Sequence, residues 1–503
     1  MSQFGFARMS LIVVAAILAS CSSYDSPTAP APFTGGPPQA PALPGAAATS
    51  SKDRIYTADQ TSNTVSVIDA GTNALLGTIA LGDPRPNVLG ALYNKQIDVH
   101  GLGFSPDGSL LAAISVTSNA VTVIETATNR IRGTVYVGRA PHEGFFTPDG
   151  RELWVAVRGE NYVSVIDPVA LRETQRIVTS DGVAMVIFRP DGKFAFVNSS
   201  RTAELAVVDV ATHAVVARVP MPSPFSPNLA VSPDGMEIWL TLKDVGKTVI
   251  VNALTFAVLG TIDTGPVTNH VNFVTTAAEK LAYVTVGGEN AVKVYRRNGG
   301  TPALVTTIAT GDTPHGMWPS ADNSTVYVGL ENADSVAVID VASQRERARI
   351  GIGQAPQALV FVANAVPTGP GTTGLTRQNV GLRIERRMVP VPEAPAARVK
   401  AVIRNLGPLD AVEVAGRLAP AGSMYDVYAV QNLVAPFGKA VKLAHVMTKT
   451  DGTFEITAQL KFFDSGFSNV VLTRPGQLPA GSSSSLVPVP VRQVASANHC
   501  SMH

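Results

Sequence analysis

The sequence predicts an all-β protein, a seven-bladed β-propeller followed by a small β-sandwich. A Pro-Asp-Gly turn recurs four times, ending at Gly108, Gly150, Gly192 and Gly235, so that successive turns lie 42 or 43 residues apart. Each turn is followed by short runs rich in β-branched and aromatic residues, which favour strands. A repeat of about 40–45 residues with four short strands is typical of a propeller blade.

The first residues, 1–20, are expected to form a lipoprotein signal peptide. The apolar run LIVVAAILAS follows a single Arg and is too short to span a membrane. Its ending, LASC up to Cys21, resembles the bacterial lipobox, and this resemblance implies cleavage before Cys21 and lipidation of its thiol. Ser22 in place of Asp favours the outer membrane, with the protein in the cell envelope and facing the periplasm or the exterior. An ordinary signal peptide with an incidental Cys is the alternative.

Residues 21–53 are rich in Pro, Ala and Ser and are expected to form an extended tether without a core. The chain has only two cysteines, so lipidation of Cys21 would leave Cys500 unpaired. The C-terminal tail offers secondary candidates for metal ligation, His499, Cys500 and His503. A disordered tail with no function is the alternative there.

The charge of the chain excludes one class of partner. Lys and Arg number 39 against 38 Asp and Glu, for a formal net charge of +1. No basic stripe stands out, so we expect no nucleic-acid partner. The partners expected instead are the membrane, reached through the lipid anchor, and another envelope protein or a small molecule.

Residues 54–366 hold seven copies of the repeat. The first copy begins at Arg54 without an innermost strand, while an extra run of that type, QALVFVA from Gln357, follows the seventh. We therefore expect this run to complete the first blade and to close the ring, which removes the open edges of the sheet.

Two segments of the repeat, YVTVGGENAVKVY from Tyr283 and SNTVSVIDAGTN from Ser62, resemble the YVTN family of β-propeller repeats. The resemblance covers about residues 54–365 and implies a seven-bladed propeller of the lactonase-like superfamily. The segment VNALT from Val251 departs from the usual Val-Ile-Asp pattern, and the turn that follows it is lost.

After the propeller, residues 367–379 read as a Gly- and Pro-rich linker. About seven short strand-like runs between residues 380 and 475 predict the β-sandwich. Residues 476–503 are expected to be a loose tail.

The sequence contains no recognisable enzyme motif such as Gly-x-Ser-x-Gly, His-Glu-x-x-His or a phosphate-binding loop. Carboxylates do recur at one position of the repeat, and we interpret them as turn caps rather than catalytic groups. They are Asp69, Glu125, Asp167, Asp209 and Asp340.

Histidine recurs in a different way. The position eight residues before the end of each turn is occupied by His100, His142, Ala184, Pro227, His270, His315 and Gln357. This position opens the innermost strand, so the four imidazoles are expected to converge at one mouth of the central channel, with Asp98 and Glu143 near them. Neutral imidazoles suit copper or zinc. In the alternative, each His is a turn residue that hydrogen-bonds a neighbouring blade.

Two classes of function therefore remain open. The first is a membrane-anchored binding or scaffolding propeller without catalytic activity, with a histidine-lined metal site at the channel mouth. The second is an enzyme, either a propeller lactonase or a metal-dependent oxidoreductase. The absence of an evident nucleophile or acid–base pair favours the binding protein.

Lipidation gives the first testable prediction. The variant Cys21→Ala should leave the membrane fraction, because it removes the thiol that would carry the lipid. Cell fractionation followed by a salt wash measures this, and a variant that still pellets with membranes would refute the anchor.

Overall fold

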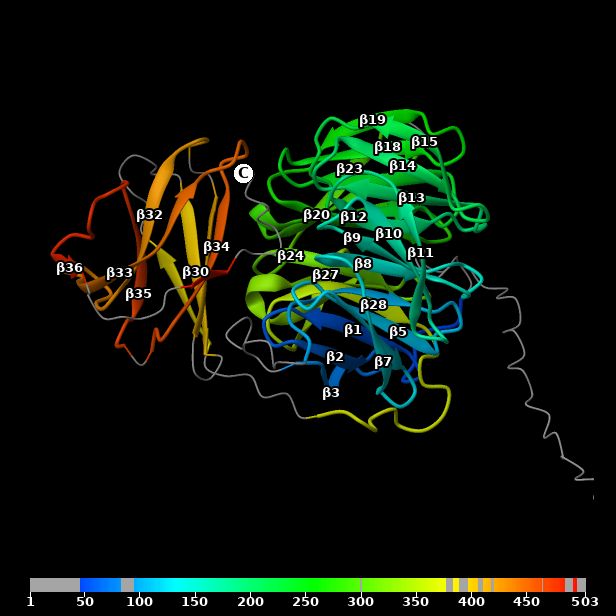
Figure 1. Cartoon of the computed structure of the whole chain (residues 1–503), viewed down its shortest axis with the longest axis horizontal. Coiled ribbons are helices and arrows are strands. Elements are labelled where there is room, and N and C mark those ends of the chain that lie inside the picture. Colours follow the sequence, from blue (N-terminus) through cyan, green and yellow to red (C-terminus); the bar gives the residue numbers. More distant parts are fainter. Residues whose placement is uncertain are drawn as a thin grey trace, which may run out of the picture. The chain divides into compact units, whose positions relative to one another are not determined.

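The computed structural model describes residues 46–82, 95–298, 301–376, 383–388, 397–405, 410–417, 420–463, 465–484 and 492–494. It confirms the all-β prediction: seven four-stranded sheets form the blades of the propeller, and two further sheets form the sandwich. Figure 1 shows the blades, coloured from blue to yellow-green, and the sandwich in orange and red. The signal peptide, Cys21 and the candidate ligands His499, Cys500 and His503 lie outside the described residues.

Every blade has the same order of antiparallel strands from the channel outward. The innermost strands are β28 (Pro356–Val362), β4 (Val99–Phe104), β8 (Pro141–Phe146), β12 (Val183–Phe188), β16 (Leu229–Val231), β20 (Thr268–Thr275) and β24 (Pro314–Pro319). The second strands are β1 (Arg54–Asp59), β5 (Leu110–Ser115), β9 (Leu153–Val157), β13 (Phe194–Ser199), β17 (Glu237–Leu242), β21 (Lys280–Val286) and β25 (Thr325–Leu330). The third strands are β2 (Thr64–Asp69), β6 (Ala120–Glu125), β10 (Tyr162–Asp167), β14 (Glu204–Asp209), β18 (Lys247–Asn252), β22 (Ala291–Arg296) and β26 (Ser335–Asp340). The outermost strands are β3 (Ala74–Ala80), β7 (Arg130–Tyr136), β11 (Arg172–Val178), β15 (Ala214–Pro220), β19 (Val258–Asp263), β23 (Ala303–Ala309) and β27 (Arg345–Gly351).

Burial decreases from the channel to the rim of each blade. The innermost strands are buried along nearly their whole length, whereas most residues of outermost strands such as β7, β15 and β27 are exposed or partly buried. The inner strands are therefore covered on both faces, although their sequences include His, Gly and Asn, and the outer strands are covered mainly on one face.

The recurring turns have the conformation that their sequence demands. Gly108, Gly150, Gly192 and Gly235 all have φ between 67° and 72°, a left-handed conformation that favours glycine. In the degenerate turn SADN, Asn323 adopts φ 58° instead, which asparagine tolerates better than most residues. Two short 3₁₀ turns, η1 (Gly287–Glu289) and η2 (Glu331–Ala333), replace the usual second hairpin turn in two blades.

Four of the five recurring carboxylates act as turn caps, as predicted, whereas Glu125 accepts a hydrogen bond from the hydroxyl group of Thr128 and pairs with Arg130. Asp69, Asp167, Asp209 and Asp340 each accept a hydrogen bond from the backbone N–H three residues later. Asn252 accepts the same bond in the divergent blade. The substitution in VNALT therefore preserves the turn.

The ring closes as the sequence predicts. β28 pairs antiparallel with β1, with Arg54 opposite Val362 and Tyr56 opposite Val360, so that the first blade combines both ends of the repeat region. All residues of β28 are buried. Closure therefore depends on a strand that lies about 300 residues from its partner in the sequence.

The expected tether and linker are shorter than the sequence suggested. The Thr49 N–H already donates to Asp322, and Asp53 is buried beside β1. After the propeller, Thr376 pairs with Thr78, and Asn129 donates to the carbonyl groups of residues 371 and 373. Composition alone missed these segments because they are held by isolated hydrogen bonds rather than by strands.

The sandwich consists of a five-stranded sheet, β29-β30-β31-β34-β37, and a four-stranded sheet, β35-β32-β33-β36. Their strands are β29 (Arg383–Met388), β30 (Arg398–Asn405), β31 (Asp410–Arg417), β32 (Met424–Val430), β33 (Gly438–Met447), β34 (Phe454–Leu460), β35 (Asn469–Thr473), β36 (Ser482–Ser484) and β37 (Arg492–Val494). One apolar cluster, which includes Ile403, Val427 and Phe454, fills the space between the sheets.

The prediction of a loose tail from residue 476 is wrong in part. β36 pairs with β33, and β37 pairs with β34, each at the edge of a sheet. Covering an edge strand removes unpaired N–H and C=O groups from solvent, which gives even a short polar segment a reason to order. No helix in the described residues is long and apolar enough to cross a membrane.

Ring closure gives the second prediction. A chain ending at Ile350 lacks β28, in which Val360, Phe361 and Val362 are at most 3% exposed. Each such side chain contributes about 1.5–3 kcal/mol when buried, so losing the strand removes much of the ~5–15 kcal/mol that stabilises a typical domain. We expect no cooperative unfolding transition in denaturant.

The matched control is a chain ending at Thr376, which keeps β28 and the segment bound to the propeller. It should unfold cooperatively. If the two truncated chains unfold alike, β28 does not close the ring in solution.

Candidate functional site

The structure brings the four predicted histidines together in the central channel. The ring centroids of His100 and His142 lie 4.2 Å apart, and those of His270 and His315 lie 4.8 Å apart. His100 and His315 link the two pairs at 6.3 Å. All four side chains are buried.

A backbone irregularity places these side chains. In β8, β20 and β24 the pairing with the second strand skips two residues, and in β4 and β12 it skips one, which is a β-bulge. Bulges redirect side chains and are common beside functional sites. His100, His142 and His315 are each the first residue of their bulge.

The residue two positions before each bulge adopts a left-handed conformation. In five blades it is not glycine but Asp98, Ala140, Val267, Thr313 or Ala355, with φ between 50° and 57°. Such conformations are costly for β-branched residues and persist only where the surrounding structure imposes them. The turn into the innermost strand is therefore strained in a way that fixes where the next side chains point.

The structure shifts His270 by one residue from the position in the repeat that the sequence predicts. The left-handed Val267 precedes Asn269 by two positions, so Asn269 occupies the recurring position and His270 is the second bulge residue. Glu143 is the second bulge residue in β8. The offset arose because the turn after β20 has lost its Pro-Asp-Gly sequence, from which the position was counted.

Glycines allow the inner strands to approach one another. A Cβ atom on Gly101 would lie 2.2 Å from the carbonyl oxygen of His142, and one on Gly103 would lie 2.0 Å from that of Gly144. On Gly316 it would lie 2.3 Å from the carbonyl oxygen of Gln357. Each of these contacts joins neighbouring blades, so larger residues would push apart the strands that carry the histidines.

Two of the histidines are oriented by the next blade. His142 Nδ1 lies 2.8 Å from the carbonyl oxygen of Ala184, and His315 Nδ1 lies 2.9 Å from that of Gln357. A carbonyl only accepts, so both Nδ1 atoms carry the proton and both Nε2 atoms keep a free lone pair. Metal-binding histidines are commonly oriented by such a backbone bond.

His270 has the opposite arrangement. Its Nδ1 lies 3.2 Å from the amide nitrogen of Asn228, which can only donate, so the imidazole proton is on Nε2. His270 is therefore less suited to bind a metal through Nε2 than its neighbours.

His100 is the unusual member of the cluster. Neither of its ring nitrogens has a hydrogen-bond partner among the described residues. Its Nδ1 lies 3.6 Å from Oε1 of Glu143, an oxygen that also lacks a hydrogen bond there. Buried polar groups are nearly always hydrogen-bonded, and leaving one unpaired costs about 1–3 kcal/mol.

Burial keeps the cluster uncharged. It is the largest cause that lowers the pKa of His100, His142 and His270 well below the usual range and that of His315 to about 3. The positive charge of Arg158 lowers the pKa of His142 further, and that of Lys243 does so at His315. Burial also raises the pKa of Glu143 well above its usual range. At neutral pH the imidazoles are therefore neutral, which is the form that binds metal ions.

One trio has the geometry of a metal site. His100, His142 and Glu143 each offer a ligand atom, and these atoms all lie within 4.8 Å of one another. Around a zinc ion with ligands at about 2.0–2.2 Å, tetrahedral ligands are separated by roughly 3.3–3.6 Å, so small side-chain movements would suffice. A cavity of about 20 Å³ reaches Glu143 and His270 and has room for about one water molecule.

Other expectations about the site have mixed outcomes. Glu143 lies in the cluster as expected, whereas Asp98 hydrogen-bonds Thr117 and is not part of the trio. The segment NVLGALYNKQIDV before His100, which makes this blade longer than the others, falls largely on residues 83–94, outside the described part of the chain. Lys243 and Asn228 could not be predicted from the repeat, because they belong to a single blade and leave no periodic signal in the sequence.

Comparison with known proteins identifies the fold. The model of the YNCE-like β-propeller family matches residues 103–306 and 289–380, together more than half of the chain. No curated protein matches the chain.

Solved structures include similar propellers. The periplasmic gluconolactonase of Pseudomonas aeruginosa is 19% identical, with 62% of this chain and 99% of that one covered and a TM-score of 0.50. A putative 6-phosphogluconolactonase of Bacteroides uniformis is 16% identical, with coverage of 62% and 99% and a TM-score of 0.52. A functionally unknown protein of Desulfotomaculum acetoxidans is 14% identical, with coverage of 61% and 98% and a TM-score of 0.52. At such identities the likeness establishes the fold and nothing about activity.

The close approach of the strands gives the third prediction. Gly101→Ala places a methyl group against the backbone of β8, so we expect a loss of about 1–3 kcal/mol of unfolding free energy, as for other overpacked cores. The strand that carries His100 should also move away from His142, which chemical-shift changes of the imidazole resonances would report.

Gly260→Ala and Gly351→Ala are the controls, because a Cβ atom at either position meets nothing within 4 Å. Both should leave stability and the imidazole resonances almost unchanged. Equal effects at all three glycines would refute a special packing requirement at the channel.

Proposed function

The chain belongs to the YNCE-like β-propeller family, and from this premise we propose that it is a metal-binding propeller of the cell envelope that holds zinc or copper at His100, His142 and Glu143. The single observation that carries the proposal is the pair of buried ring nitrogens of His100 that lack a hydrogen-bond partner among the described residues. A bound cation would be a ligand partner for His100 and for the facing Glu143 oxygen, neither of which has a hydrogen-bond partner among the described residues.

The composition of the trio favours these ions. Two imidazoles and one carboxylate around an open fourth position are a common zinc ligand set, and imidazole also suits copper. His142 is already oriented by the carbonyl oxygen of Ala184, so little entropy is lost when its Nε2 binds. His315 lies beside His100 and can supply a further nitrogen.

Binding a cation would also convert the carboxyl group of Glu143 into its ionised form. Without a cation, burial raises the pKa of Glu143 well above its usual range and so favours the protonated carboxyl group. A divalent ion beside it favours the carboxylate, so metal binding is coupled to loss of a proton.

The location and partners of the protein are part of the same proposal. The lipobox-like LASC sequence supports a lipid anchor at Cys21, with the propeller in the periplasm or outside the cell. There the protein would bind a small molecule or another envelope protein rather than nucleic acid, in line with its near-zero net charge.

Metal binding gives the fourth prediction. Protein purified without an affinity tag should contain about one equivalent of zinc or copper by elemental analysis. After chelation and reloading, His100→Ala and His142→Ala should each weaken binding by at least about 100-fold, because one of three protein ligands is gone. Isothermal titration with Zn²⁺ and with Cu²⁺ measures this.

His445→Ala is the matched control, because this His lies in the sandwich, is 43% exposed and pairs with Asp426. It should bind as the unchanged protein does. If the double variant His100→Ala/His142→Ala keeps the affinity, the ion binds elsewhere.

An enzyme of the lactonase or metal-dependent oxidoreductase type is the alternative. The open fourth position of the trio favours it, since a metal ion there can activate a bound water molecule. Hydrolysis of a panel of lactones, with and without Zn²⁺, separates the two functions. Metal-dependent hydrolysis that is lost in His142→Ala would make the protein an enzyme.

A further inference from the structure

A second cavity, of about 330 Å³, lies between the propeller and the sandwich. The propeller contributes Lys243 and Asp312 to its wall, among others, and the sandwich contributes Arg417, Lys449 and Phe454. This volume is within the range of small-molecule sites. Polar and apolar groups both line it, as in pockets that hold an organic ligand.

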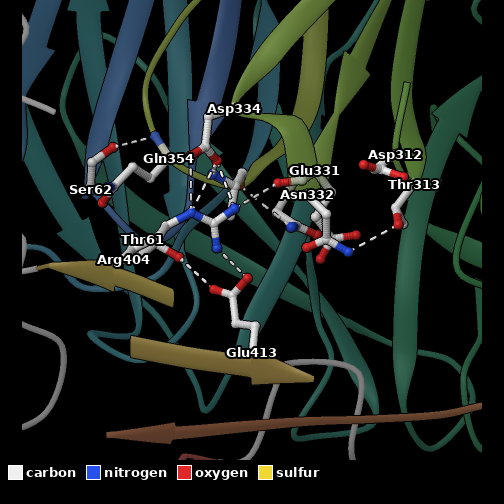
Figure 2. A network of polar contacts seen from close by, with 12 residues as sticks. Thr61, Ser62, Asp312, Thr313, Glu331, Asn332, Asp334, Gln354, Arg404 and Glu413 are labelled. Carbon is white, nitrogen blue, oxygen red and sulfur yellow. Dashed lines mark hydrogen bonds and ion pairs between the residues drawn. The ribbon is translucent and has the colours of Figure 1, made fainter. Parts of the chain in front are cut away.

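Arg404 of the sandwich joins the sandwich to the propeller near this cavity, and we call its ion-pair contacts the arginine clamp. Figure 2 shows the guanidinium group of Arg404, from β30, directed between Asp334 of the propeller and Glu413 of β31. Arg404 is fully buried, and it also donates to the carbonyl oxygen of Glu331. Both carboxylates raise its pKa against the effect of burial, so the clamp stays charged. Such a bidentate, charge-assisted contact fixes the geometry of the surfaces that it joins.

Charges inside the cavity are unbalanced. Five basic side chains line it, Lys243, Arg398, Lys400, Arg417 and Lys449, against three carboxylates, those of Asp312, Asp451 and Glu455. The carboxylate of Asp312 pairs with Lys400, and that of Asp451 accepts hydrogen bonds from Thr453. Positive charge is therefore in excess.

Lys243 forms no ion pair within the described residues, and burial raises the pKa of Glu331, the carboxyl group on which the charge of Lys243 acts, to about 7. Lys243 follows β17, is 3% exposed, and its ammonium group has no hydrogen-bond partner among the described residues. Removing an ammonium group from water without a partner is costly, so buried charges in proteins are usually paired. Lys449, which the sandwich contributes to the wall, also carries an amino group, and burial lowers its pKa. The two amines converge on a space that an anion would fill.

We propose that this cavity binds a small organic anion, a carboxylate or a phosphate ester, with its charged group against Lys243 and Lys449. The apolar wall at Phe454 would contact the carbon skeleton of the ligand. An anion would pair with the ammonium group of Lys243, which has no hydrogen-bond partner among the described residues, whereas a cation or a neutral sugar would not.

The cavity also lies close to the histidine cluster. The charge of Lys243 acts on His142, His270 and His315, in each case as a cause secondary to burial. A ligand held at Lys243 would thus lie next to the channel mouth. This proposal adds an anion site to the proposed metal site but does not depend on a bound metal.

The experiment compares three ligands that share one skeleton: glycerol 3-phosphate, glycerate and neutral glycerol. Each is titrated calorimetrically into the full chain in EDTA. We expect glycerol 3-phosphate, glycerate or both to bind and glycerol not to bind. Lys243→Met should weaken anion binding at least about tenfold, as expected for the loss of a charge-assisted contact. Lys439→Met, at an exposed site in β33, should bind as the unchanged protein does.

Thermal unfolding without ligand keeps the test decisive if binding is lost. Lys243→Met should melt at the same or a higher temperature than the unchanged chain, because it removes a buried, unpaired charge. A large fall in melting temperature would make Lys243 a structural residue and overturn the proposal. Equal binding of anions by Lys243→Met, or equal binding of glycerol, would also overturn it.

The variant His142→Ala separates this proposal from the metal site. Anion binding in EDTA should survive in it. If anions bind only after zinc is added and are lost in His142→Ala while Lys243→Met has no effect, the anion is a ligand of the metal and the lysine site does not exist.

Discussion

The close packing of seven innermost strands around the channel is the constraint on which the rest of the structure depends. The strands come so near that the Cα atoms of Gly101, Gly103 and Gly316 face the carbonyl oxygens of the next blade without room for a methyl group. Closure of the ring by β28 fixes this spacing, because an open sheet could relax outward. The side chains of His100 and His142 are consequently held close together and away from water.

This constraint explains why the channel histidines are both close and neutral. Bulges and left-handed residues at the start of the inner strands turn them toward the axis. Burial then makes protonation costly, so the cluster presents lone pairs rather than charges. His142 and His315 each donate a hydrogen bond from Nδ1 to a carbonyl oxygen of a neighbouring blade. Of the four histidines, only His100 has no hydrogen-bond partner among the described residues. The alternative interpretation, in which each His is a turn residue that hydrogen-bonds a neighbouring blade, thus explains His142 and His315. It does not explain His100.

Periodicity made much of the architecture predictable. The blades could be counted from the sequence, because the Pro-Asp-Gly turns and the capping carboxylates recur at regular positions. Closure of the ring could be predicted as well, because the first repeat lacks an innermost strand and an extra one begins at Gln357. The same counting misplaced His270 by one residue, where the turn had lost its glycine. Lys243 and Arg404 could not be found in this way, because each occurs in one blade or strand only and the residues around it come from distant segments. The edge strands β36 and β37 were missed for a similar reason, since their Ser-rich and short sequences order only by pairing.

The central claim is that the channel holds a metal ion between His100, His142 and Glu143. Anomalous scattering at the zinc absorption edge, from a crystal of the zinc-loaded protein, tests it most directly. The account predicts one peak at about 2.0–2.2 Å from a nitrogen of each imidazole and an oxygen of Glu143. A loaded crystal in which the trio has no peak, while zinc is found at the surface, would contradict it.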